Sequence, residues 1–122
     1  MGMHFMEQWL RVLESRPQYV TICDWNNFHE ETAIEDSEEW VDYYGTPTPD
    51  WYRRIAQGYI YLLRTGRLIN GFYYQEQGEK EIWQSSMRQL TLQTKKPHGA
   101  PILLLPRGWL ATLPKRASPA YH

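Results

Sequence analysis

The feature that most constrains the fold of this chain is a helix signature between Thr48 and Gly66. Thr48 suits the N-cap of a helix, Pro49 suits its first turn, and Gly66 suits the left-handed residue that ends it. Between these positions, apolar residues at helical spacing cover about half of the circumference. We therefore predict a helix over 49–65 that lies across a sheet or in the middle of the core.

Shorter elements precede this long helix. Apolar residues at helical spacing predict a first helix over 5–15. The run 19–23 is rich in β-branched residues and predicts a strand, which the loop 24–33 follows. A second short helix is predicted over 36–44, and Gly45 suits its C-terminal end.

The second half of the chain predicts strands. One strand is expected over 67–75, and one long strand or two broken pieces over 81–94, where the end alternates cleanly. The loop 95–101 leads to a short buried strand over 102–105. We therefore predict a small single α+β domain, in which two or three helices pack on one face of a mainly antiparallel sheet of about four strands.

The length of 122 residues suits one domain, which we expect over 1–113, with a basic, Pro-containing tail over 114–122. No apolar run approaches the ~20 residues of a membrane span, and no secretory signal is recognised at the start. The single cysteine excludes a disulfide framework and indicates a reducing compartment. We expect a cytoplasmic protein without membrane insertion, either free or peripheral on a membrane-bound complex.

The net charge of −1 conceals a strong division along the chain. Residues 1–81 hold seven Lys or Arg and all fourteen acids, whereas residues 82–122 hold six Lys or Arg and no acid. We call 24–50 the acidic segment and 88–116 the basic segment. Their charges either face each other within the fold or face separate partners.

The segments also contain aromatic residues that the core of a small domain does not need. The chain has six Trp and nine Tyr, and aromatic rings are enriched at the centres of protein interfaces. The predicted acidic docking face is Trp25, Glu30, Glu31, Glu35, Asp36, Glu38 and Glu39. The predicted basic docking face is Arg88, Lys95, Lys96, Arg107, Trp109, Lys115 and Arg116.

Candidate catalytic groups are few. No catalytic signature surrounds Cys23, and the adjacent carboxylate of Asp24 disfavours a thiolate, so we expect a buried structural cysteine. His29 and its acidic neighbours lack any recognised zinc spacing. We expect no catalytic residue, no metal and no cofactor.

These observations favour a non-enzymatic accessory or adaptor subunit that docks on a larger intracellular protein assembly. An acidic protein, such as a small electron carrier of the ferredoxin type, is a candidate partner for the basic face. One alternative is a nucleic-acid-binding module that uses the basic segment. The others are a phage-type anti-defence protein, whose acidic patch mimics phosphates, and a small enzyme that uses Cys23 and His29.

Overall fold

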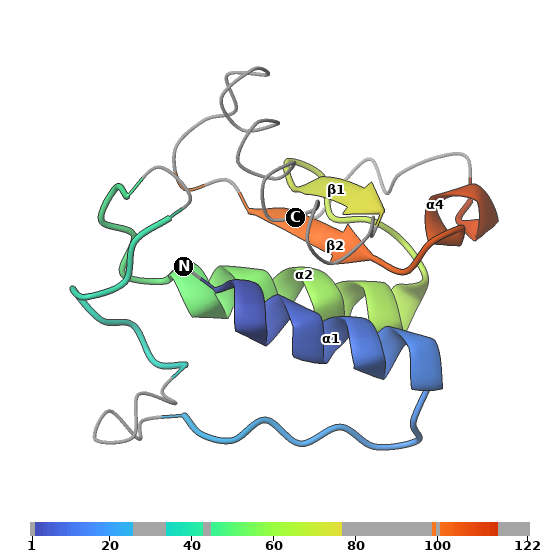
Figure 1. Ribbon diagram of the computed structural model, residues 1–122, viewed down its shortest axis with the longest axis horizontal. Helices are drawn as coiled ribbons and strands as arrows, with labels where there is room; N and C mark the ends of the chain where they lie inside the picture. The colour runs from blue at the N-terminus through green and yellow to red at the C-terminus, as the bar shows by residue number, and fades with distance from the viewer. Residues whose placement is uncertain (1, 26–33, 43–44, 77–98, 100, 115–122) are drawn as a thin grey trace.

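The computed structural model describes residues 2–25, 34–42, 45–76, 99 and 101–114. Within these ranges it has three helices and two strands: α1 (Met3–Ser15), α2 (Trp51–Thr65), β1 (Tyr73–Glu76), β2 (Ile102–Leu105) and α4 (Trp109–Thr112). α1 and α2 lie side by side under the pair of strands, and α4 follows β2 at one end (Figure 1). The described part is therefore a small α+β arrangement with both long helices on one side of the strands.

The predicted long helix is confirmed, and it begins at Trp51. Its N-cap is Asp50, and the hydroxyl of Thr48 donates to the carbonyl of Thr46 at 3.0 Å instead of capping the helix. Gly66 ends the helix with φ 69°, and its N–H bonds to the carbonyl of Leu62 at 2.8 Å. The C-terminal signal thus acts as predicted, because glycine accepts the left-handed conformation without strain.

An aromatic cluster joins α1 to α2. The rings of Trp9 and Tyr59 stack at a centroid distance of 5.3 Å with an interplanar angle of 7°. Phe5 makes edge contacts with both Trp9 and Tyr52, and Tyr52 makes a further edge contact with Trp40. Much of the aromatic content is therefore core material, which also pins the segment around Trp40 to the two helices.

The strand β2 lies at the centre of this core. All four of its residues are fully buried, and it pairs in parallel with β1 from Tyr73 opposite Ile102 to Glu76 opposite Leu105. The backbone of Leu104 bonds to a side chain: the Tyr59 hydroxyl donates to its carbonyl at 2.8 Å and accepts from its N–H at 2.9 Å. A helix side chain therefore satisfies backbone groups that a neighbouring strand satisfies in a larger sheet.

The predicted antiparallel sheet of four strands is wrong. The described residues form only two strands, and these run parallel. The unbroken apolar run of β2 is typical of a parallel strand covered on both faces. The strand over 67–75 forms only from Tyr73 onward, and the strand predicted over 81–94 lies outside the described residues.

Two further elements were predicted wrongly. Residues 19–23 form no strand but lie exposed at the surface, and Tyr19 is 83% exposed. Residues 36–42 form no helix: residues 38–39 form a turn, and Val41 makes an isolated bridge with Pro47. The carboxylate of Asp42 accepts the N–H of Thr46 at 3.0 Å, a local bond that competes with a helix.

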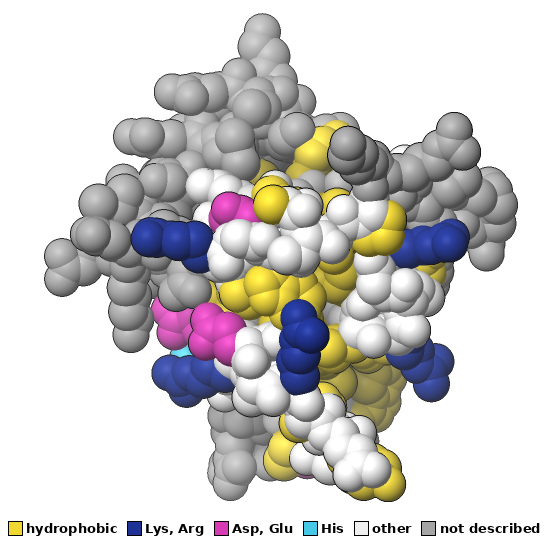
Figure 2. Space-filling view, turned by 90° about the vertical axis from the view of Figure 1, so that its right-hand side faces the viewer, with side chains coloured by type: hydrophobic (Ala, Val, Ile, Leu, Met, Phe, Trp, Pro, Cys, Tyr) yellow, Lys and Arg dark blue, Asp and Glu magenta, His cyan; other side chains and the backbone are white. Residues whose placement is uncertain are grey.

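Figure 2 looks onto the end of the molecule where α1 and α2 finish. Hydrophobic side chains remain visible in the middle of this face, and Lys and Arg side chains are spread around them. The acidic side chains on this face gather at one side (Figure 2). On α2, Ile60 and Leu63 remain 37% and 39% exposed, so this helix does not bury all of its apolar surface under the strands.

We predict that Tyr59→Phe lowers the free energy of unfolding by about 2–4 kcal/mol, because it leaves the buried N–H and carbonyl of Leu104 without a partner. Urea unfolding measures this loss. Tyr19→Phe is the matched control, since that ring is exposed, and we expect it to change stability by less than about 0.5 kcal/mol. Equal effects of the two changes would contradict the role of the Tyr59 hydroxyl.

We predict that Gly58→Ala destabilises the fold by about 1–3 kcal/mol, although alanine normally favours a helix over glycine. A Cβ at Gly58 overlaps Leu103 Cδ1 and lies 3.0 Å from Phe72 Cδ2, and Leu103 is fully buried. Gln57→Ala, one position earlier on α2, is the control. Thermal unfolding of both variants tests the sign, and a stabilised Gly58→Ala would show that the strand can move away.

Candidate functional site

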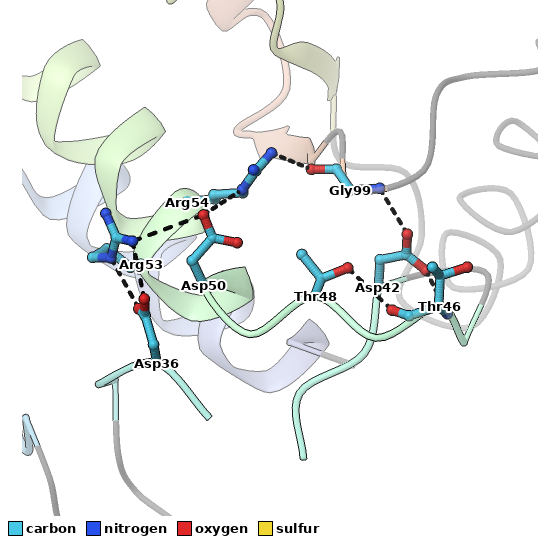
Figure 3. A network of polar contacts seen from close by, with 8 residues as sticks. All are labelled: Asp36, Asp42, Thr46, Thr48, Asp50, Arg53, Arg54 and Gly99. Atoms are coloured by element: carbon cyan, nitrogen blue, oxygen red, sulfur yellow. Dashed lines mark hydrogen bonds and ion pairs between the residues drawn. The ribbon is translucent and has the colours of Figure 1, made fainter. Parts of the chain in front are cut away.

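Ion pairs hold the acidic segment against the start of α2 (Figure 3). Arg53 binds the carboxylate of Asp36 with two hydrogen bonds, Nε to Oδ1 at 3.0 Å and Nη2 to Oδ2 at 3.1 Å. This contact lowers the pKa of Asp36 and raises the pKa of Arg53. Arg54 donates to Asp50 at 2.8 Å and to the carbonyl of Gly99 at 3.0 Å.

Asp42 joins the same segment to Gly99 from the other side (Figure 3). Its side chain is buried, and it accepts the N–H of Gly99 at 2.7 Å and the N–H of Thr46 at 3.0 Å. A buried carboxylate is costly unless hydrogen bonds satisfy it, and two backbone donors do so here. The acidic segment therefore touches the basic segment at Gly99, where the Asp42 carboxylate binds a backbone N–H.

The described members of the predicted acidic face lie in different surroundings. Glu38 and Glu39 are exposed, and Glu35 is half-buried. Asp36 is exposed but pairs with Arg53, so its charge is partly balanced within the fold. Trp25 is exposed, and Glu30 and Glu31 lie outside the described residues.

Of the predicted basic face, only Arg107 and Trp109 are described. Arg107 is exposed, whereas Trp109 is half-buried and packs against the core. The guanidinium of Arg16 lies 5.2 Å from the centre of the Trp109 ring, within the range of a cation–π contact. The remaining members, Arg88, Lys95, Lys96, Lys115 and Arg116, lie outside the described residues.

The prediction of a buried cysteine is wrong. Cys23 is exposed, because the segment that carries it runs along the surface beside α1 and forms no strand. The described residues contain no group of three His, Cys, Asp or Glu side chains that could hold a metal ion. His29 lies outside the described ranges.

A groove of about 590 Å³ lies along the outer face of α2. One wall is a stripe of α2 side chains spaced three and four residues apart, and the other comes from the acidic segment and the residues just before it. We call this feature the docking groove. Its lining residues are Ile22, Trp25, Ile34, Arg53, Ala56, Gln57, Ile60, Tyr61, Arg64 and Thr65.

Apolar side chains stay exposed inside the docking groove. Trp25 is 53% exposed, Ile22 is 41% exposed and Ile60 is 37% exposed. Backbone hydrogen bonds hold the wall that carries Trp25. The carbonyl of Trp25 accepts the N–H groups of Ile34 at 3.0 Å and Glu35 at 2.7 Å. The groove is therefore shaped by backbone contacts of the fold, and its lining includes apolar surface that is exposed to solvent.

Sequence reasoning identified Trp25 but missed the rest of the groove. Ile60 falls in the apolar arc of the predicted long helix, and helical spacing does not separate it from the residues that face the core. The available signal was the width of that arc, about half of the circumference, which exceeds the stripe that one core-facing side requires. Part of such an arc must cover a second surface.

No protein-family model matches the chain, and searches against curated proteins and solved structures found no significant match. None of the helices in the described ranges has the length and apolar character to cross a membrane. The geometry of the docking groove is therefore the basis for inferring function.

We predict that Asp42→Ala costs about 2–4 kcal/mol of folding stability, because it leaves the N–H groups of Gly99 and Thr46 without their acceptor. Urea unfolding measures the stability, and amide hydrogen exchange at Gly99 reports the local contact. Glu39→Ala, an exposed change in the same segment, is expected to leave both quantities unchanged. Unaltered exchange at Gly99 in Asp42→Ala would contradict the contact.

Proposed function

We propose that the protein is a non-enzymatic accessory or adaptor subunit, and that it docks on a larger protein assembly through the docking groove. The observation that carries this proposal is the clustering of exposed Ile22, Trp25 and Ile60 in one concavity. Single exposed apolar residues are ordinary on protein surfaces, but an apolar concavity with charged ends is typical of a binding site.

Contacts behind both walls support a role in docking. The α2 wall is anchored from behind, because Trp51, Ile55 and Tyr59 are fully buried in the core. On the opposite wall, Trp25 accepts backbone bonds from Ile34 and Glu35, and Asp36 pairs with Arg53. A preformed groove loses little conformational entropy when a partner binds, so its apolar area contributes to affinity.

The chemistry of the groove supports binding rather than catalysis. The polar groups on the side chains of its described lining residues are two guanidinium groups, one amide, one phenol, one hydroxyl and one indole N–H. None of these groups ordinarily exchanges a proton near neutral pH. They can orient a partner by hydrogen bonds and charge, which is the task of an accessory subunit.

The test is affinity purification of the tagged protein from cells of its native host at low salt, with gel filtration to measure the size of the complex. Ile60→Asp places a charge in the groove and is expected to reduce the yield of the co-purified partner at least about tenfold. Leu63→Asp is the matched control, because Leu63 lies on α2 with similar exposure but outside the groove lining.

Both variants must unfold at the same urea concentration for the comparison to hold. A wild-type protein that elutes alone at low salt would refute the docking role. Equal recovery of the partner by Ile60→Asp and Leu63→Asp would refute the groove as its surface. Binding of a generic oligonucleotide that is lost steeply with salt would instead support the nucleic-acid-binding alternative.

A further inference from the structure

The length of the docking groove selects the kind of occupant. Arg53 and Arg64 lie on the same face of α2 and are both part of the lining, about three turns or roughly 16 Å apart. A small molecule covers only part of this length. A peptide segment of about three helical turns covers all of it.

The α2 wall of the groove offers few backbone partners, because the backbone of α2 is bonded within the helix. On the other wall, the carbonyls of Asp24 and Trp25 already accept the N–H groups of Ile34 and Glu35. An extended segment lying along α2 would gain no backbone hydrogen bonds from the helix. A helix satisfies its own backbone and needs only apolar side chains at helical spacing to fill the groove.

The charge of the groove is uneven along α2. At the N-terminal end, Arg53 is already balanced by Asp36 at 3.0 Å and by Asp50 at 3.8 Å. At the C-terminal end, Arg64 is exposed and makes no ion pair within the part of the chain that the structure describes, and Arg67 is exposed shortly beyond it. The described lining contains no Asp or Glu.

Positive charge lies beside exposed apolar surface at this end of the groove. Arg64 follows the exposed Ile60 by one helical turn, and both belong to the groove lining. This pairing complements a segment that carries carboxylates beside its apolar side chains. The positive charge of Arg64 and Arg67 also speeds encounter with an acidic partner at low ionic strength.

We propose that the docking groove binds an acidic amphipathic helix of the partner protein, with the carboxylates of that helix at the Arg64 end. This inference rests on the proposed function and names the chemistry of the docking segment. Ile22, Trp25 and Ile60 receive the apolar face of the partner helix. Arg64 pairs with its acidic side chains, whereas Arg53 remains bound to Asp36 and holds the groove wall.

Two fluorescein-labelled peptides of equal length test this inference by fluorescence anisotropy at low salt. Both carry leucine on one helical face; the other face carries glutamate in one peptide and lysine in the other. The glutamate peptide is expected to bind the full-length protein at least about tenfold more tightly than the lysine peptide. Arg64→Glu is expected to reverse this order, and Arg11→Glu, an exposed change on α1 outside the groove lining, is expected to preserve it.

Several outcomes would overturn the inference. These are equal binding of the two peptides, absence of binding by both at millimolar concentration, and a glutamate-peptide affinity that Arg64→Glu leaves unchanged. A dimer of the free protein that Ile60→Asp dissociates would assign the groove to a second copy instead. One result separates the two proposals: Ile60→Asp loses the native partner, whereas Arg64→Glu retains it at every salt concentration tested. In that case the docking function stands, and the proposal that the partner segment is an acidic helix is refuted.

Discussion

The Tyr59 hydroxyl donates one hydrogen bond to Leu104 and accepts another from it, inside a core that excludes water. Because a buried backbone group without a partner costs more than a hydrogen bond gains, these contacts fix where β2 can lie against α2. They also fix the rotation of α2 about its own axis, since Tyr59 must face β2. The face that carries Ile60 and Arg64 is thereby turned away from the strands, and the docking groove follows from this rotation.

Close approach and charge reinforce the same arrangement. Gly58 leaves room for Leu103 on the inner side of α2, so the helix and β2 approach more closely than any side chain at that position would allow. At the N-terminal end of α2, Arg53 and Arg54 bind side chains of the acidic segment, and Arg54 also binds the carbonyl of Gly99. One helix therefore organises the core with one face, the acidic segment with its first turn and the groove with its outer face.

Local signals in the sequence predicted the long helix and the buried run of β2, because the end at Gly66 and the apolar residues are read within a few positions. The parallel direction of the pairing between β1 and β2 was not predictable in this way, since it depends on the path of the chain that connects the two strands. Residues 36–42 of the predicted helix over 36–44 are not helical, and the Asp42 side chain makes a competing local bond to the backbone N–H of Thr46. The groove was missed because one apolar arc serves two surfaces, and helical spacing does not divide it between them.

The contact between Tyr59 and Leu104 joins residues 45 positions apart, which has a consequence for the order of events during synthesis. Both long helices leave the ribosome well before β2, so the apolar faces that will receive β2 stay uncovered in the meantime. Closing so long a loop carries an entropic cost, and the burial of Ile102–Leu105 in the core offsets it. Before β2 is available, the apolar surface that packs against it lacks this cover, and exposed apolar surface is what makes incompletely folded chains prone to aggregate.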